Sequence, residues 1–355
     1  MAMFAPEVSA MGVRREWLWA AGAAGVLLGL RRALPRYSFA GKVVVVTGAS
    51  RGLGLVLARQ LARRGAKLAI CARDGAELER ARAELAGRGA DVLAVSCDVS
   101  DPAQTAALVA QTLGRYGALD VLINNAGIIQ VGPLESMGLH DFREAIEINY
   151  FGMVHTTLAA LPHLRGRRRG RIVNICSIGG AVPAPHLLPY VGSKYAAVGF
   201  SEGLSVEAAR DGIRVTTILP FVMRTGSHWN ALFKGVREKE VAWFATLASL
   251  PGSSLRAERA ARRILLACER GETYVTVGIL AKVARVAHGL APGLVNRAAA
   301  LVNRLLPAPG GAGSGDFGEP GWLHRPPGAR GPLTRLGDEA ARNNREVPWA
   351  PPAGS

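Results

Sequence analysis

The chain contains few cysteines and few aromatic residues. Its 355 residues include four cysteines, Cys71, Cys97, Cys176 and Cys268, which lie far apart and form neither a CxxC motif nor a Cys/His cluster. This spacing argues against a disulfide framework or a zinc ribbon, favours buried thiols in a reducing compartment and predicts no metal site. Aromatic residues make up 6% of the chain, and no basic stretch carries the interleaved aromatics that stack nucleic-acid bases.

Acidic residues are scarce relative to basic ones. The chain has 27 Asp and Glu against 43 Lys and Arg, which gives a formal net charge of +16. Such an excess fits nucleic acid, an anionic membrane surface or an acidic ligand as partner. Because no nucleic-acid reader motif accompanies the charge, we expect no nucleic-acid partner. Hydrophobic residues make up 49% of the chain, which is enough to bury a sizeable core.

The N-terminal residues 1–40 contain one uncharged apolar run, residues 17–30, with arginines on both sides. As a helix this run measures about 21 Å, which is shorter than the roughly 30 Å hydrocarbon core of a bilayer. Flanking arginines reach lipid headgroups, so the run predicts a membrane anchor, either a thin span or an interfacial helix. A cleaved signal peptide and a soluble extension that packs on the protein are the alternatives.

The C-terminal part divides into two segments by composition. Residues 279–306 are amphiphilic and predict a helical extension that faces a membrane, forms a lid or covers the edge of a sheet. Residues 307–355 are rich in proline and glycine, and their arginines and acids balance. That composition predicts a disordered tail, so the excess positive charge belongs to the preceding residues.

Short apolar segments alternate with helical ones from residue 41 onward. The strand candidates are residues 42–46, 67–72, 91–96, 121–124, 171–175 and 214–219. The main helix candidates are residues 53–64, 75–85, 142–161 and 190–210. Fully apolar strands between helices are typical of a parallel sheet covered on both faces, with right-handed crossovers. We therefore predict an α/β fold, a Rossmann-type doubly wound parallel sheet, in a single domain over residues 41–278.

A glycine-rich turn follows the first predicted strand. It reads Thr47-Gly48-Ala49-Ser50-Arg51-Gly52-Leu53-Gly54 and leads into a predicted helix. Glycines allow a tight turn and let backbone N–H groups approach a pyrophosphate, and the helix N-terminus supplies a positive dipole end. Glycines also occur in turns for purely steric reasons. The position of this loop between a predicted strand and a predicted helix is what indicates a nucleotide-binding role.

Three further motifs follow in order along the chain. They are Asn124-Asn125-Ala126-Gly127 after the fourth strand, Ser177 after the fifth, and Tyr190-Val191-Gly192-Ser193-Lys194 at the start of a helix. With the TGxxxGxG loop, this series resembles the short-chain dehydrogenase/reductase family over roughly residues 41–277. The resemblance implies a nicotinamide-dependent oxidoreductase that interconverts a carbonyl and an alcohol. The sequence departs from the family at Pro220-Phe221, where the family usually has Pro-Gly.

The candidate catalytic residues are a proton donor and the residues that adjust its pKa and bind the substrate. Tyr190 and Lys194 are four residues apart and share a helix face, so we expect the Lys194 ammonium to lower the pKa of the Tyr190 phenol. The phenol then protonates a developing alkoxide or deprotonates an alcohol, while the Ser177 hydroxyl binds the substrate oxygen. The resemblance assigns the same roles to these three residues and adds Asn149 as the fourth catalytic position.

The choice of nicotinamide cofactor depends on the end of the second strand. An acid there binds the adenosine ribose, whereas a nearby arginine accommodates a 2′-phosphate. Here Ala72 stands at the expected acid position and Arg73 follows, with Arg51 in the glycine loop. We therefore predict NADP(H) rather than NAD(H). The alternatives are that both arginines are solvated surface residues and that Asp74 binds the ribose.

The resemblance extends the cofactor site beyond the glycine loop. It implies that Asp98 contacts the adenine, that Asn125 and Gly127 line the trough, and that Thr225 holds the nicotinamide carboxamide. The full set of predicted cofactor-binding residues is Gly48, Ser50, Arg51, Gly52, Leu53, Gly54, Arg73, Asp98, Val99, Asn125, Ala126, Gly127, Tyr190, Lys194, Pro220 and Thr225.

Two mostly apolar segments, residues 179–189 and 221–250, are the candidates for the substrate side. They predict a hydrophobic carbonyl or alcohol substrate, lipid-like, steroid-like or long-chain. With the N-terminal run, they predict a membrane-associated enzyme whose catalytic domain lies in the cytoplasm, with a soluble cytoplasmic enzyme as the alternative. The resemblance implies a homodimer or homotetramer through helices 142–161 and 190–210. The competing function is a non-catalytic NADP(H)-binding membrane scaffold or regulator.

Overall fold

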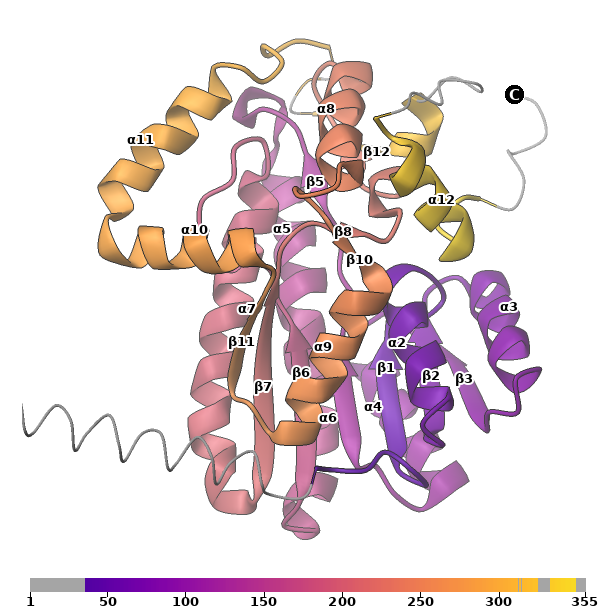
Figure 1. Ribbon diagram of the computed structural model, residues 1–355. Coiled ribbons are helices and arrows are strands. Elements are labelled where there is room, and N and C mark those ends of the chain that lie inside the picture. The colour runs from indigo at the N-terminus through magenta and orange to yellow at the C-terminus, as the bar shows by residue number, and fades with distance from the viewer. Residues whose placement is uncertain (1–35, 312, 314, 325–332, 349–355) are drawn as a thin grey trace, which may run out of the picture. The chain divides into compact units, whose positions relative to one another are not determined.

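Seven parallel strands form the central sheet of the computed structural model, which describes residues 36–311, 313, 315–324 and 333–348. The strand order is β11-β7-β6-β4-β1-β2-β3 (Figure 1). The strands are β1 Val43–Thr47, β2 Lys67–Ala72, β3 Val92–Ser96, β4 Val121–Asn124, β6 Gly170–Ile175, β7 Ile213–Pro220 and β11 Tyr274–Val277. The order reverses direction between β1 and β4, so the predicted Rossmann-type doubly wound sheet is confirmed.

Helices cover both faces of this sheet. On one face α2 (Gly52–Ala62) packs against α9 (Ala257–Arg270), with α3 (Gly75–Ala86) beside α2. On the other, α4 (Pro102–Tyr116) packs against α6 (Gly152–Gly166), and α5 (Leu139–Ile146) packs against α7 (Leu188–Glu207). Strands covered in this way are mainly apolar, and β1 and β4 are buried at every position, including the polar Thr47 and Asn124 at their ends.

The predicted helix over residues 142–161 is divided in the structure. A π-helical turn, Glu147–Phe151, separates α5 from α6 and carries Asn149. A π turn inserts one residue into the helical repeat, and such insertions are frequent at functional sites. An apolar periodicity does not reveal a single inserted residue, so the sequence predicted one continuous helix.

The predicted extension 279–306 consists of two helices, α10 (Ile279–Leu290) and α11 (Pro292–Asn303). Pro292 at the start of α11 ends the first helix, because proline lacks the N–H group that would continue it. Both helices lie beside the C-terminal end of the sheet (Figure 1). Only Ala281 of α10 is buried, and α11 has no buried residue.

The prediction of a disordered tail over residues 307–355 is wrong for its described part. That part contains the short strand β12 (Glu319–Pro320) and helix α12 (Arg335–Asn343). The helix packs on α8 (Arg237–Ser249) and β8 (Met223–Arg224) and buries Ala341 completely. The composition of residues 307–355 indicated disorder because it is rich in proline and glycine. The described part is nevertheless ordered, because a few specific contacts hold it on the domain.

The predicted N-terminal anchor, residues 17–30, lies outside the described residues. Among the residues that the structure does describe, none of the helices is long and apolar enough to cross a membrane.

Candidate functional site

The glycine loop joins β1 to α2 and is tied to the loop that follows β4. The Asn125 side-chain amide donates to the carbonyl oxygens of Thr47 and Gly48, each at 3.0 Å. The Thr47 hydroxyl accepts the N–H groups of Asn125 and Ala126 at 2.9 and 3.0 Å. Gly54 lies so close to the Gly48 carbonyl and to Asn125 that a Cβ there would clash with both. The tight joint therefore requires these residue types.

The loop geometry leaves backbone donors at the start of α2. Gly48 and Gly52 have φ values of +63° and +57°, which glycine adopts without strain. The helix has no acidic residue in its first turn and no side-chain cap. The N–H groups of Leu53 and Gly54 form no hydrogen bond with another described residue. This end of α2 therefore retains the positive dipole end and the free donors that suit an anion.

A cavity of about 910 Å³ runs from this loop to the start of α7. Of the predicted cofactor-binding and catalytic residues, all but Gly54 line it, and Gly54 lies behind the loop. The glycine motif, the Asn125 loop, Ser177 and the Tyr190 helix therefore face one space, although they are far apart in the sequence. The carboxyl ends of parallel strands meet at one edge of the sheet, which explains this convergence.

The arginines predicted near the adenosine end differ in their surroundings. Arg51 forms an ion pair with Glu77 at 2.9 Å, and its Nε lies 3.6 Å from Glu346. Arg73 is exposed, and among the described residues no ion pair of its side chain is found. The Asp74 carboxylate accepts the Glu77 N–H at 2.8 Å and so caps α3. Asp74 therefore caps α3 through one carboxylate oxygen while it also lines the cavity.

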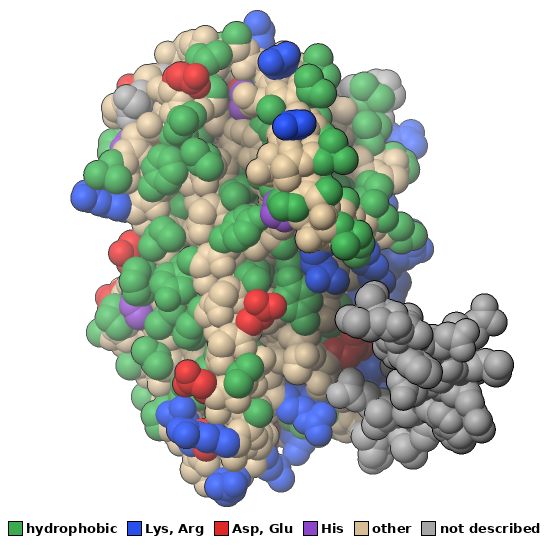
Figure 2. All heavy atoms as spheres, turned by 90° about the vertical axis from the view of Figure 1, so that its left-hand side faces the viewer, with side chains coloured by type: hydrophobic (Ala, Val, Ile, Leu, Met, Phe, Trp, Pro, Cys, Tyr) green, Lys and Arg blue, Asp and Glu red, His purple; other side chains and the backbone are tan. Residues whose placement is uncertain are grey.

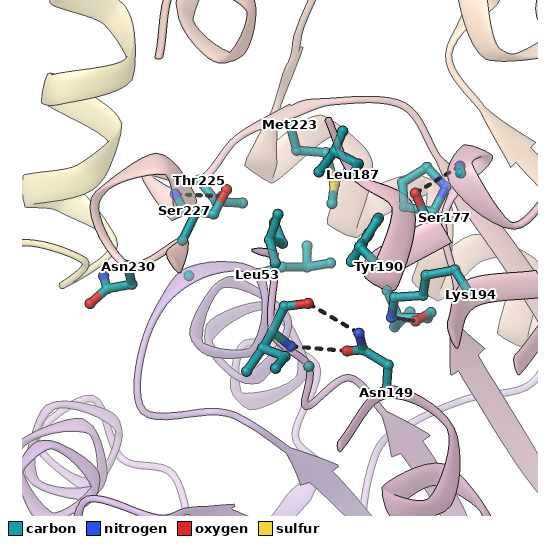
Figure 3. Close-up of a pocket in the computed structure, with 18 of the residues that line it drawn as sticks. Leu53, Asn149, Ser177, Leu187, Tyr190, Lys194, Met223, Thr225, Ser227 and Asn230 are labelled. Atoms are coloured by element: carbon teal, nitrogen blue, oxygen red, sulfur yellow. Dashed lines mark hydrogen bonds between the residues drawn. The ribbon is translucent and has the colours of Figure 1, made fainter. Parts of the chain in front are cut away.

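The candidate catalytic residues come from three elements. Ser177 follows β6, Tyr190 and Lys194 lie in the first half of α7, and Asn149 lies in the π-helical turn. Figure 3 shows these four side chains along one side of the cavity, with Leu53 and Thr225 across from Tyr190. The Lys194 Nζ lies 5.6 Å from the centre of the Tyr190 ring and donates to the Ile175 carbonyl at 3.3 Å.

Burial is the main cause of the pKa shifts of Tyr190 and Lys194. It raises the pKa of Tyr190 to about 12, and a hydrogen bond with Ser177 offsets this only in part. Burial also lowers the pKa of Lys194. The expectation that Lys194 lowers the pKa of Tyr190 is therefore wrong for the protein alone, because loss of hydration outweighs any attraction of the phenolate to the ammonium.

Asn149 is held rigidly by backbone and side-chain partners. Its side-chain oxygen accepts the Ile128 N–H at 2.9 Å, and its amide donates to the Ile128 carbonyl at 3.1 Å and to the Ser193 hydroxyl at 3.0 Å. A Cβ at Gly127 would lie 2.7 Å from the Asn149 side-chain oxygen. The π-helical turn, the Asn125 loop and α7 thus meet at this side chain.

The far part of the cavity is apolar. Both predicted segments contribute, since the lining includes Val182, Leu187, Met223, Phe244 and Leu247. A further wall consists of Ala284 of α10, of Val295, Ala298, Ala299 and Val302 of α11, and of Trp322. A lid is one of the three roles predicted for residues 279–306, but sequence reasoning did not indicate Trp322. It also missed Glu346, which lies against the glycine loop. Neither motif nor spacing marks these residues, because only the tertiary fold brings these distant parts of the chain to the cavity.

Comparison with known proteins agrees with this geometry. A family model described as short chain dehydrogenase matches residues 42–232. The granaticin polyketide synthase putative ketoacyl reductase 1 of Streptomyces violaceoruber is 40% identical over 185 residues, which is 52% of this chain and 68% of the relative. The 11-beta-hydroxysteroid dehydrogenase A of Sesamum indicum is 38% identical over 247 residues, which is 67% of this chain and 68% of the relative.

A solved structure shares the fold as well. The short chain dehydrogenase/reductase from Burkholderia phymatum in complex with NAD superposes with a TM-score of 0.64 at 25% identity. The match covers 73% of this chain and 96% of that one.

The substitution Gly127→Ala tests the close contact with Asn149. The added methyl group would push on the Asn149 side-chain oxygen, so we expect the free energy of unfolding to fall by about 1–3 kcal/mol. Urea denaturation measures the change. The matched control is Gly199→Ala in α7, where a Cβ meets no atom within 4 Å and stability should rise by up to about 1 kcal/mol. An equal effect of both substitutions would contradict the contact.

Proposed function

This chain belongs to the short-chain dehydrogenase/reductase family, and we propose that it is an NADP(H)-dependent oxidoreductase that interconverts a hydrophobic carbonyl compound and its alcohol. The family acts on CH–OH and C=O groups and binds a nicotinamide cofactor. The observation that carries the proposal is the presence of Asn149, Ser177, Tyr190 and Lys194 along one side of the cavity that the glycine loop also lines.

The residues present fit a nicotinamide dinucleotide. At the start of α2, the N–H groups of Leu53 and Gly54 form no hydrogen bond with another described residue and suit a diphosphate. Asn125 and Gly127 would lie along the dinucleotide, and Lys194 would donate to the nicotinamide ribose. When bound, the nicotinamide supplies or accepts the hydride.

In the proposed reaction, side chains of this protein transfer the proton and stabilise the charges that the transfer creates. In the reducing direction, the Tyr190 hydroxyl donates its proton to the substrate oxygen, while the Ser177 hydroxyl hydrogen-bonds the same oxygen and stabilises its developing charge. The Lys194 ammonium stabilises the phenolate that remains. Asn149 holds the Ile128 backbone and Ser193 in place, which orders the helix that carries Tyr190 and Lys194.

Replacement of Tyr190 by Phe removes the proton donor and keeps the ring. We expect the rate of ketone reduction to fall by about 10²–10⁴-fold, with NADPH binding retained. Because burial raises the pKa of Tyr190 to about 12, the wild-type phenol stays protonated at neutral pH. Alcohol oxidation needs the phenolate, so its kcat/KM should rise with pH from 7 to 10, by up to about tenfold per unit.

Initial rates of NADPH oxidation with a panel of hydrophobic ketones measure the first effect, and NADP⁺ reduction at varied pH measures the second. A wild-type protein that binds NADPH tightly and turns over no member of the panel would instead support the scaffold.

The preference for NADP(H) rests chiefly on Arg73. This side chain lines the cavity at the end of β2 without an acidic partner among the described residues, and Asp74 is held at the α3 cap. Arg51 shares its charge with Glu77, so Arg73 is the cation more available to a 2′-phosphate. An exposed guanidinium holds a phosphate through charge-assisted hydrogen bonds.

The substitution Arg73→Asp should lower the preference for NADPH over NADH by about 10- to 100-fold, which corresponds to the loss of one or two charge-assisted hydrogen bonds. Fluorescence titration with both cofactors gives the ratio of dissociation constants. Arg63→Asp, an exposed arginine just after α2, makes the same charge change away from the cavity and should leave the ratio unaltered. An unchanged ratio in Arg73→Asp would refute the assignment.

The substrate class follows from the apolar wall. Much of the lining contributed by residues 182–187, 221–247 and α11 is aliphatic or aromatic. A long-chain, steroid-like or lipid-like substrate would bury its apolar surface there, at about 25 cal/mol per Å².

A membrane surface is the partner we propose for α10 and α11. Ile279, Leu290, Leu294 and Leu305 are each more than 60% exposed, and no acid occurs in residues 273–315. Figure 2 views the face on which α10 and α11 lie and shows apolar side chains with lysine and arginine among them. Apolar side chains among cations match an anionic lipid interface.

Charge reversal at Arg297 and Arg304, both exposed, tests this surface. We expect the double variant Arg297→Glu and Arg304→Glu to bind vesicles that contain 30% phosphatidylserine at least tenfold more weakly than the wild type does, since each cation near such a surface contributes about 1 kcal/mol. Co-sedimentation measures the binding, and vesicles of pure phosphatidylcholine are the comparison. Resistance of the pelleted protein to alkaline carbonate reports separately on residues 17–30. Equal binding of the wild type and the double variant to phosphatidylserine vesicles would contradict the proposal that α10 and α11 bind an anionic membrane.

We also propose a homodimer or homotetramer through α5–α7. Leu139, Leu158, Tyr195 and Val206 are exposed on these helices, and their burial between copies would remove apolar surface from water.

A further inference from the structure

The C-terminal tail returns to the glycine loop after α12. The Gly52 N–H donates to the Asn344 carbonyl at 2.9 Å, and the Asn344 side chain donates to the Thr225 carbonyl at 3.2 Å. Two residues later, the Glu346 carboxylate lies against Gly52, where a Cβ would clash with its Oε1. Residues 344–346 thus span the cavity from the start of α2 to the loop that follows β8.

The Glu346 carboxylate is buried and has defined hydrogen-bond and ion-pair partners. It is 6% exposed, and the Asn230 amide donates to its carboxylate and to its backbone carbonyl, each at 2.7 Å. Its carboxylate also lies 3.6 Å from the Arg51 guanidinium. The first turn of α2 contains no acid of its own, so the tail supplies an anion to a helix end that favours one.

We propose that Glu346 sets the affinity of the cofactor site: its carboxylate occupies the place of the cofactor's diphosphate, and the dinucleotide must displace it to bind. The proposal rests on the proposed function, which assigns the diphosphate to this loop. Asn230 and Arg51 hold the Glu346 carboxylate beside the glycine loop, and a diphosphate placed next to that carboxylate in so enclosed a place would be repelled strongly. The Gly52 N–H becomes available to a phosphate only when the Asn344 carbonyl leaves.

The rest of the tail can remain bound while the carboxylate moves. In α12, Ala341 packs so closely on Gly226 that a Cβ on the glycine would clash with it. Asp338 accepts from His228 at 3.5 Å. These contacts lie ahead of residue 344, so displacement involves the few residues after the helix.

The protonation of Glu346 links this competition to pH. Burial raises the pKa of Glu346 to about 7. Arg51 and the Asn230 hydrogen bond oppose this shift, and Glu77 adds to it. The other charged groups nearby are paired elsewhere: Arg345 with Glu84 at 2.9 Å, and His228 with Asp338.

A protonated Glu346 carries no charge to repel the diphosphate. If only this form admits the cofactor, the admitting fraction falls from about nine-tenths at pH 6 to about one-tenth at pH 8.

The test is a titration of the full-length protein with NADPH, followed by nucleotide fluorescence at pH 6 and pH 8. We expect the dissociation constant of the wild type to rise about tenfold more between these pH values than that of Glu346→Gln. At pH 8, Glu346→Gln should bind about tenfold more tightly than the wild type. Glu346→Ala should change the affinity in the same direction.

The matched control is Glu339→Gln, which removes a half-exposed carboxylate of α12 that pairs with Arg335 of the same helix. It should titrate like the wild type. Thermal unfolding of each variant checks that the fold is retained, and comparison of both Glu346 variants separates loss of the charge from loss of the side chain.

Two results would overturn the proposal while leaving the function intact. Equal affinities in all variants would mean that the carboxylate does not compete, and weaker binding by Glu346→Gln would mean that the tail clamps a bound cofactor. If neither NADPH nor NADH binds any variant, the proposed function itself fails, and the competition fails with it.

Discussion

The contact between two loops, one after β1 and one after β4, is the constraint on which the site depends. Asn125 and Thr47 tie these loops together, and the missing side chain of Gly54 lets α2 approach the Gly48 carbonyl. The joint fixes the start of α2 and, through residues 127 and 128, the position of Asn149. The start of α2 and the side of the cavity that carries Asn149 are therefore held by one connected set of contacts.

The same cavity holds groups whose charged forms are costly to bury. Tyr190 remains a neutral phenol at physiological pH, and Lys194 is a weaker base than in water. Glu346 titrates near neutrality. A bound dinucleotide would bring its own charges into this space, so the protonation of all three groups is linked to its arrival.

Most of the sheet and the line of residues from Gly48 to Lys194 could be predicted from the sequence. The strands β2 and β4 have the bounds that the apolar runs indicate, because a strand buried on both faces has to be apolar along its length. The motifs converge for a topological reason, since each follows the carboxyl end of a parallel strand.

Three features of the fold and the site could not be predicted from the sequence, each for a physical reason. The π-helical turn at Asn149 changes the helical phase by one residue, which a hydrophobic pattern does not register. The tail was misjudged because α12 is held by a few contacts, such as Ala341 on Gly226, that composition does not express. Glu346 reaches the loop only through the tertiary fold, and nothing near it in the sequence marks it as a partner of Arg51.

Helix α11 has a consequence for the dynamics of the cavity wall. It contributes four lining residues yet buries no residue completely, so its own hydrogen bonds and its contact with α10 provide most of its stability. A helix of 12 residues is marginal in water without tertiary packing. Local opening of α11 therefore costs far less free energy than global unfolding. The part of the cavity wall that α11 forms can therefore open and re-form while the sheet and the loops after β1 and β4 stay folded.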